Sequence, residues 1–311
     1  MKDIYKHIII IACMPACGYC VSIADTVNLN EVSVISPKSI TFSNGSNVKK
    51  IEPFKIKISQ TEKIADLLSS NSSIYIKHYG ALATATIRGT SSSHTAVNWN
   101  GYPINSIANG LSDLSNITAL TNDNIFLIKG GNSTIFGSGS IGGSINIDSK
   151  KIRNQKLSSN TNFESGSNGL SSQSYSAKYG DDIVSFYILH SKLKDKNKFK
   201  FTNISQAGNP RQTNKHGKIV SFQNKLDLNF KLNPNIIIQF NYWGDNSIRE
   251  VPQNMTIRFT DAMQYDVNDR ISISSTYSAK NLSCKISKAL IYEDFRYTEQ
   301  IKNIDSQYLA S

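Results

Sequence analysis

Three glycines at the spacing G-x-G-x-x-G are the residues of this chain whose types and spacing could do chemistry. They are Gly137, Gly139 and Gly142. A dinucleotide site with this spacing needs a helix directly after the glycines, so that the helix N-terminus meets the pyrophosphate. The residues that follow here favour β-structure, and no acidic residue stands at the distance needed to bind a ribose. A tight turn between two strands is therefore favoured, and nucleotide binding is the weaker alternative.

No other group of residues indicates catalysis or a metal site. The five histidines are scattered without the spacing of metal ligands, and no order of serine, histidine and acid stands out. The adjacent acids Asp181 and Asp182 fall in an expected turn. We therefore expect neither an enzyme nor a bound metal or cofactor. The histidines are His7, His78, His94, His190 and His216.

The glycines lie between two segments with the character of strands. Residues 125–131 are mainly apolar, residues 132–140 are small and polar, and residues 141–148 alternate apolar with small or polar side chains. Period-2 alternation is typical of a strand with one buried face. We expect a strand, a turn and a half-buried second strand, with Ile141, Gly143, Ile145 and Ile147 on one face.

This region resembles the closing signature of the plug domain of TonB-dependent outer-membrane receptors. That signature is a strand followed by L/I-(R/K)-G and then Y/F-G-S-G-A-I-G-G-x-I-N-I; the chain has I-K-G-G over 128–131 and F-G-S-G-S-I-G-G-S-I-N-I over 136–147. A second signature, I-R-G followed by V-x-x-D/N-G-v-P-l-n, is similar to residues 87–89 and 97–105. Two signatures in the expected order make the resemblance specific. The plug-motif residues that it implies are Arg88, Gly89, Asn100, Gly101, Gly137, Gly139, Gly142 and Gly143.

Composition agrees with a barrel surface better than with a nucleic-acid-binding protein. The 311 residues carry a net charge of +11, but the basic residues are scattered, without an Arg-rich run or zinc-finger spacing. Mean hydropathy is −0.31. The chain has no apolar run of about 18 residues, the length that a membrane-spanning helix requires. Transmembrane β-strands remain possible because they are short and alternating.

Residues 1–24 have the features of an export signal. Lys2 and Lys6 precede an uneven apolar stretch, and Ser-Ile-Ala at 22–24 is a small-x-small cleavage site. A buried first strand is the alternative. Residues 10–13 also resemble a lipoprotein cleavage box, which would place a lipid on Cys13. Removal of the signal would leave Cys284 as the remaining cysteine, and no intramolecular disulfide is then expected.

Residues 25–36 contain an alternating segment suited to pairing at a strand edge. It is formed by Glu31, Val32, Ser33 and Val34. In the resembled family such a segment is the TonB box, which pairs with TonB by strand addition, where main-chain hydrogen bonds supply the affinity. The resemblance thus implies TonB binding here, and an ordinary disordered tail is the alternative. Residues 37–50 are rich in Ser, Asn and Gly, so that the interval 25–50 is expected to be a TonB-box segment and a linker.

The interval 51–150 is expected to form a small α+β plug domain. We predict a helix over 61–70 with Thr61 as N-cap, strands over 74–77, 84–89 and 97–99, and a short helix or turn over 111–117. Asn100-Gly101 is a hairpin turn signal. The resemblance further implies that Arg88 faces the barrel wall and pairs with barrel carboxylates, a solvated arginine at a strand end being the alternative.

The interval 151–311 is expected to form antiparallel transmembrane β-barrel strands. We predict about seven strands between 157 and 292. Connections alternate short and long, as in outer-membrane barrels with short periplasmic turns and longer outer loops, although the first connection, 166–170, is short. Because plugged transporters have about 22 strands, the barrel is expected to be incomplete and the chain truncated. The clearest alternation places Phe222, Leu226, Leu228, Phe230 and Leu232 on one face.

The resemblance implies energised import of a scarce ligand across the outer membrane. Its implied partners are the TonB complex of the inner membrane, outer-membrane lipid, a small ligand and a surface lipoprotein, without nucleic acid. Residues 88–94, 98–101 and 249–252 look most like the cobalamin-receptor-like branch of the family, and a ferric-siderophore receptor is the near alternative. A non-transporting β-rich surface adhesin or interaction protein is the alternative from a different class.

Overall fold

A computed structural model describes most of the chain beyond residue 46. The described residues are 47–58, 63–79, 82–107, 109–118, 123–131, 133–137, 139–252, 255–256, 260–279 and 282–310, and they belong to one compact unit, residues 36–311. The export signal, the lipoprotein box and the segment Glu31–Val34 lie outside them, as do Thr61, Ser138 and residue 311.

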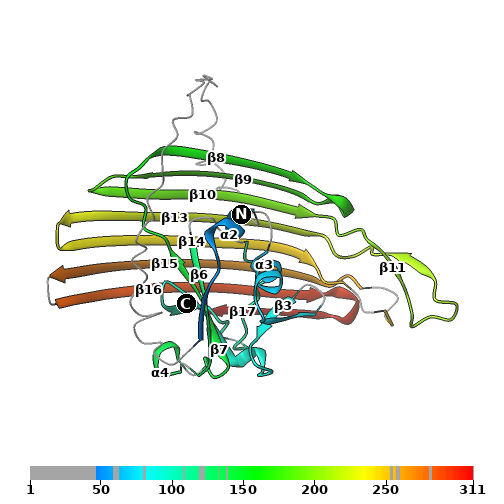
Figure 1. Cartoon of the computed structure of the whole chain (residues 1–311). Coiled ribbons are helices and arrows are strands. Elements are labelled where there is room, and N and C mark those ends of the chain that lie inside the picture. The colour runs from blue at the N-terminus through cyan, green and yellow to red at the C-terminus, as the bar shows by residue number, and fades with distance from the viewer. Residues whose placement is uncertain are drawn as a thin grey trace, which may run out of the picture. The chain divides into compact units, whose positions relative to one another are not determined.

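The first half of the described chain is a small α+β domain, called the plug from here on. Its main sheet has the strand order β1-β6-β7-β4-β5, in which β4 and β7 are parallel and the other neighbours antiparallel. A separate hairpin pairs β2 with β3. The strands are β1 (Asn47–Lys50), β2 (Tyr75–Tyr79), β3 (Leu82–Thr86), β4 (Thr95–Trp99), β5 (Tyr102–Pro103), β6 (Asp123–Lys129) and β7 (Gly143–Ser149). The helices are α2 (Pro53–Ile58), α3 (Ile64–Asn71), α4 (Ser133–Phe136) and the 3₁₀ turn η1 (Ser92–His94) (Figure 1).

Burial in the plug core shows which predictions about α3 and β7 were right and which were wrong. Leu67 and Leu68 on α3 are fully buried in the same apolar cluster as Ile145 and Ile147 on β7, so the amphipathic helix covers the sheet. Residues 143–147 are buried on both faces, not half-buried. Ile141 precedes the strand and is 54% exposed. Period 2 was misleading because Ser144 and Asn146, although polar, are buried as well.

Three plug elements were not expected from the sequence. Residues 47–50, expected in the linker, form β1 and pair with residues 126–129 of β6. Residues 53–58 form α2. The turn between β6 and β7 also contains the short helix α4. The helix predicted over 61–70 is present as α3, with Lys63 at the N-cap position.

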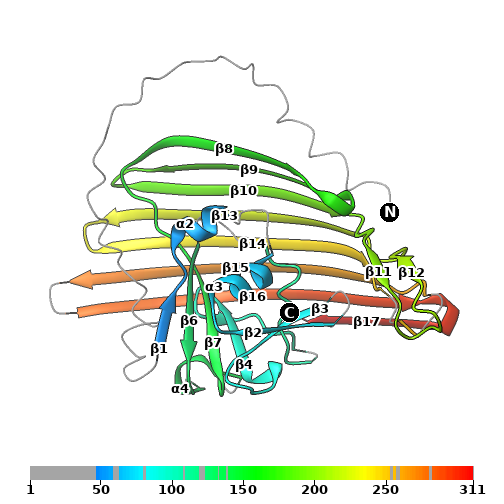
Figure 2. The ribbon, with the colours of Figure 1, turned by 45° about the vertical axis from the view of Figure 1, so that its right-hand side comes forward.

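The second half of the chain is an eight-stranded antiparallel sheet, called the wall from here on. The strand order is β17-β16-β15-β14-β13-β10-β9-β8 (Figure 2). Within the described residues β8 and β17 are its outermost strands and do not pair with each other. The strands are β8 (Gln155–Ser165), β9 (Ser171–Gly180), β10 (Val184–Asp195), β13 (Ile219–Asn233), β14 (Ile236–Glu250), β15 (Met263–Ala279), β16 (Leu282–Glu299) and β17 (Ile304–Ala310).

The wall has eight strands among the described residues, where the sequence predicted about seven. β16 continues to Glu299, seven residues past the predicted end, and a connection containing the 3₁₀ turn η3 (Gln300–Lys302) leads into β17. The long connection 196–218 carries a two-stranded ribbon, β11 (Lys200–Thr202) paired with β12 (Arg211–Thr213).

The connections of the wall differ between its two ends. At one end they are all short: 181–183, 234–235 and 280–281. At the other end they include 196–218 and 251–262, but also the short connections 166–170, which contains the 3₁₀ turn η2 (Ser167–Gly169), and 300–303. The predicted alternation of short and long connections therefore holds in the middle of the wall and fails at its two outermost strand pairs. The end with the long connections is called the outer end, following the usual arrangement of outer-membrane strands.

The two faces of the wall have opposite character. On β14 and β15 the buried positions are almost all polar, whereas Ile248, Ile271 and Ile273 on the opposite face are exposed. This is the inward-polar and outward-apolar alternation of transmembrane barrel strands. The face predicted for residues 219–232 is present, because Leu226 and Leu228 pair directly with the aromatic residues Tyr242 and Phe240 of β14. No helix among the described residues is long and apolar enough to cross a membrane.

Candidate functional site between plug and wall

Buried charged side chains line the inner face of the wall where the plug contacts it. They come from every second position of β13, β14 and β15, so the pleat of the sheet turns them all inward. A buried charge is very costly unless it is paired and hydrogen-bonded. The partners of these side chains therefore define the interface. The residues are Lys225, Asp227, Asp245, Arg249, Asp266 and Arg270.

Arg249 joins the outer end of the wall to a plug loop. Its side chain is 1% exposed, and its guanidinium lies 2.5 Å from a carboxylate oxygen of Asp113 on the plug and 3.1 Å from one of Asp266 on β15. It also donates to the Ser115 hydroxyl at 2.8 Å. Asp113 in turn accepts the backbone N–H of Ala83 on β3 at 3.1 Å. One arginine thus connects two wall strands with the plug loop between β5 and β6, which is itself bonded to β3.

Lys225 makes a second bridge between plug and wall. Its ammonium contacts the Asp123 carboxylate at the start of β6 and lies 3.5 Å from that of Asp227 on its own strand. Burial raises the pKa of Asp123 to about 6, the Lys225 ammonium opposes this, and the Asp227 carboxylate adds to it. Two carboxylates share one cation, which leaves one of them poorly compensated. The protonated fraction of Asp123 therefore grows as the pH falls through about 6.

Aromatic rings form a third contact, beside the Lys225 bridge, since Trp243 is the β14 residue that pairs with Lys225. Trp99 of the plug and Trp243 of β14 lie with ring centroids 6.0 Å apart at an interplanar angle of 56°. The Arg270 guanidinium lies 4.4 Å from the Trp243 ring centroid and forms an ion pair with Asp245. Tilted ring pairs and cation–π contacts are each favourable when desolvated. Tyr102, just after the β4–β5 turn, donates to the Ser287 hydroxyl of β16 at 2.8 Å.

Arg88 does not have the contact expected of it. Its side chain is exposed, its φ is 55°, and within the described residues no ion pair joins it to a wall carboxylate. Plug and wall do form ion pairs, but the charges are reversed relative to the prediction. The wall supplies the cations Lys225 and Arg249, and the plug supplies the acids Asp123 and Asp113. Arg88-Gly89 instead forms a turn of two left-handed residues, with φ of 55° and 72°.

The remaining motif residues have backbone roles in the plug. Asn100 and Gly101, at φ 50° and 88°, form the turn of the predicted hairpin between β4 and β5. Gly137 has φ 84° and follows α4. The element after the glycines is strand β7, which lacks the helix N-terminus that a pyrophosphate site uses.

Gly143 is the motif residue with the strictest requirement for glycine. Its φ is +153°, and a Cβ atom there would collide with the Ile128 carbonyl oxygen and lie 2.9 Å from Cδ1 of Ile87. We predict that Gly143→Ala lowers the free energy of unfolding of the plug by about 3 kcal/mol, since backbone cannot move aside cheaply. The measurement is hydrogen exchange of the β7 amides in the full chain.

Gly139→Ala is the matched control for that substitution. An added Cβ there would meet only the Ser93 carbonyl oxygen at an ordinary 3.6 Å. We expect a change within about 0.5 kcal/mol. Equal exchange rates in the two variants would contradict the steric account of the motif.

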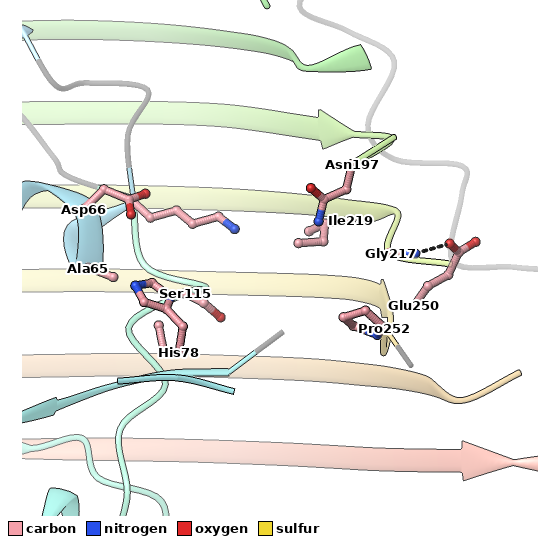
Figure 3. A pocket seen from close by; sticks show the side chains of 11 residues that line it. Ala65, Asp66, His78, Ser115, Asn197, Gly217, Ile219, Glu250 and Pro252 are labelled. Carbon is pink, nitrogen blue, oxygen red and sulfur yellow. Dashed lines mark hydrogen bonds between the residues drawn. The ribbon is translucent and has the colours of Figure 1, made fainter. Parts of the chain in front are cut away.

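Two cavities lie between plug and wall near the outer end. The smaller one, about 200 Å³, is lined by Asp66 and His78 of the plug and by Glu250 and Pro252 at the end of β14. Figure 3 shows these residues on opposite sides of the space, with Glu250 accepting the Gly217 N–H at 2.8 Å. The larger cavity, about 550 Å³, is lined by plug residues 102–107 and by polar residues of β15 such as Gln264 and Asn268.

A family comparison fits this arrangement. Residues 30–144 match the family described as TonB-dependent Receptor Plug Domain. That interval holds the whole signature at 87–105, the glycines of the closing signature and every plug residue that contacts the wall in the bridges above. The chain carries the plug of a TonB-dependent receptor.

One curated protein and several solved structures are similar to parts of this chain. The vitamin B12 transporter BtuB of Photobacterium profundum is 34% identical over 90 residues, which are 28% of this chain and 15% of that protein. The copper transporter OprC superposes with a TM-score of 0.65 at 15% identity, covering 80% of this chain and 38% of OprC. The siderophore receptor PiuA from Acinetobacter baumannii gives 0.58 at 14% identity, covering 81% and 37%.

The solved structures share the fold of this chain over part of their length. The chain spans 15% of the length of the curated relative and under two fifths of the two solved structures. Their fold is the plug followed by antiparallel barrel strands, as observed here. TonB-dependent receptors, whose plug family matches residues 30–144, are outer-membrane proteins.

Sequence reasoning missed the four residues that bridge plug and wall. Alternation over 219–232 puts Lys225 on the polar face, opposite Leu226, and Arg249 was expected at the start of a loop, although it lies in β14. Asp113 lies in the segment expected to be a short helix or turn, and Asp123 lies two residues before the strand predicted from residue 125. The available signal was a charge at an inward position of a transmembrane strand, which requires a buried partner.

Proposed function

We propose that this chain belongs to a receptor that imports a scarce small ligand across the outer membrane with energy supplied through TonB. The observation that carries the proposal is the plug, held against the polar face of the wall by Arg249 and Lys225, with two cavities near the outer end. A ligand bound there would contact plug and wall together. Displacing the plug would then open a path along the polar inner face.

The proposal divides the chain into four parts: an export signal at 1–24, a TonB-box segment and linker at 25–50, the plug at 51–150 and barrel strands from 151 to 311. Within the second part, Glu31, Val32, Ser33 and Val34 would pair with TonB as an added strand. Support for this assignment comes from the alternating sequence and from the family of the plug that follows it. The eight plug-motif residues would keep the plug in its seated form.

For the ligand we propose a cobalamin-like molecule first and a ferric siderophore second. The curated relative is a vitamin B12 transporter, and its similarity covers 28% of this chain. PiuA is a siderophore receptor, but its 14% identity supports a shared fold alone. The smaller cavity is lined by the carboxylates of Asp66 and Glu250 and by the imidazole of His78, and these groups could hydrogen-bond the amide arms of a corrinoid.

The test is ligand binding and uptake by cells that produce the whole receptor with one altered cavity residue. His78 lies at the tip of the β2–β3 hairpin and lines the smaller cavity. We expect His78→Trp to fill part of the cavity and weaken cobalamin binding by about tenfold, because lost contacts there are worth about 1.4 kcal/mol. The measurement is the equilibrium dissociation constant for labelled cobalamin, repeated with a ferric siderophore.

Tyr75→Trp is the matched control. Tyr75 lies on the same hairpin, is exposed, and lines neither cavity. Its substitution should leave both affinities unchanged. If neither ligand binds the unaltered receptor, the choice of ligand is wrong; if His78→Trp and Tyr75→Trp bind the same ligand equally well, the ligand does not occupy this cavity.

A further inference from the structure

The outward face of β10 changes character along the strand. Val184 and Ile188 are exposed apolar side chains near the end with the short connections, and they are followed on the same face by His190, Lys192 and Lys194. Tyr187 lies on the opposite face of β10 and is buried, so that face points inward. Because side chains of a strand alternate, these even-numbered residues all face away from the plug.

The neighbouring strands β9 and β13 change from apolar to polar outward side chains at the same level along the strands. Ile188 lies beside Leu226 of β13 and Ala177 of β9. Two rows further out, Lys192 lies between Phe222 and Gln173, and its ammonium is 5.2 Å from the Phe222 ring centroid. The apolar surface therefore ends in an aromatic ring covered by a lysine. Lysine side chains at such a boundary lay their methylene stems along apolar surface and keep the ammonium in the polar layer.

The basic character continues beyond the end of β10. The segment 192–218 contains eight Lys and Arg residues and one acid, Asp195, and so carries seven of the eleven net positive charges of the chain. Seven of the eight bases are exposed. Lys196 packs its stem over Gly169 in the connection between β8 and β9. The exposed bases are Lys194, Lys196, Lys198, Lys200, Arg211, Lys215 and Lys218.

The acids near this segment are engaged with backbone groups. Asp195 accepts the Asn197 N–H at 2.7 Å. Glu250 accepts the backbone N–H groups of Gly217 and Lys218 at 2.8 and 2.9 Å and lines the smaller cavity. No ion pair among the described residues engages the lysines of this segment, so their ammonium groups are available to an external anion.

We propose that this outer-end lysine surface, formed by Lys192, Lys194, Lys196, Lys198 and Lys218, binds phosphate groups of an anionic lipid in the outer leaflet. Continuity with the apolar face of β10 argues for a lipid, since acyl chains would cover Val184 and Ile188 while the headgroup reaches the lysines. A soluble polyanion would need the charge but not the adjoining apolar surface. Lysine donates charge-assisted hydrogen bonds to phosphate oxygens. The inference rests on the membrane location and is independent of the imported ligand.

The test compares two triple variants of the full chain purified in detergent micelles. One is Lys192→Gln, Lys194→Gln, Lys196→Gln at the outer end. The control is Lys156→Gln, Lys178→Gln, Lys231→Gln, which removes equal charge from exposed positions near the short connections. Each is titrated with diphosphoryl lipid A, with the same lipid after removal of its phosphates, and with inorganic phosphate, and native mass spectrometry counts bound lipid.

We expect saturable binding of diphosphoryl lipid A, at least tenfold weaker in the outer-end triple variant and unchanged in the control. Dephosphorylated lipid and inorganic phosphate should bind weakly to all three proteins. Equal weakening in both variants would overturn the proposal, because only net charge would then matter. Equal affinity for dephosphorylated lipid would overturn it as well.

Discussion

Replacing Arg249 by methionine should release the outer part of the plug from the wall. The substitution leaves Asp113 and Asp266 close together without their cation, and both are largely buried. Removing one partner of a buried ion pair costs about 3–5 kcal/mol, mostly because the other charge is left uncompensated. Hydrogen exchange can detect the loss of stability in this loop. The Leu114 N–H donates to the Ala83 carbonyl at 2.8 Å, and the Ser115 N–H donates to the Asp113 carboxylate at 2.9 Å. Exchange of these amides should accelerate by about a hundredfold or more.

Arg296→Met provides the matched control. Arg296 and Asp305 form an ion pair at 2.7 Å between β16 and β17, with side chains 50% and 58% exposed. Exposed pairs contribute about 0–1 kcal/mol, so this variant should leave exchange in the plug unchanged. Adding Asp113→Asn and Asp266→Asn to Arg249→Met should recover most of the lost protection. If the triple variant exchanges as fast as Arg249→Met alone, packing of the arginine stem rather than its charge holds the plug.

Local patterns in the sequence predicted the elements that local physics controls. The turn at Asn100-Gly101 follows from two residues that tolerate positive φ, and the strand face of Leu226 and Leu228 follows from period 2. Both depend on neighbours within a few positions along the chain. The identity of the plug also came from short spacings, those of its glycines.

Contacts between distant segments could not be predicted in the same way. Asp113 and Arg249 are separated by 136 positions, and Asp123 and Lys225 by 102. Alternation shows that Lys225 faces inward but not which plug acid meets it. Arg88 was assigned to such a contact because it is a conspicuous charge in a motif, yet its left-handed backbone belongs to a turn. β17 was missed because its pairing partner, β16, extends further than its apolar alternation indicates.

Proline at position 32 should abolish uptake while leaving ligand binding intact. Strand addition to TonB requires main-chain hydrogen bonds, and proline has no N–H to donate. In cells that produce the whole receptor, Val32→Pro should reduce energised uptake of the bound ligand to the level of cells lacking TonB. Val32→Thr keeps the N–H and the β-branch and should retain uptake. Ser39→Pro places the same residue in the linker and tests whether proline acts only at the pairing segment.

Binding and transport separate the competing functions in this experiment. Val32→Pro should change transport alone, because Val32 belongs to the proposed TonB-pairing segment, whereas His78→Trp should change affinity because His78 lines the cavity near the outer end. A surface adhesin would be insensitive to Val32→Pro in any assay of attachment, and its ligand would never enter the cell. Uptake that persists in Val32→Pro would remove Glu31–Val34 as the TonB-binding segment without affecting the interface of Arg249 and Lys225. That interface would then require another connection to the energy source, since a plug held by two buried ion pairs does not leave the wall unaided.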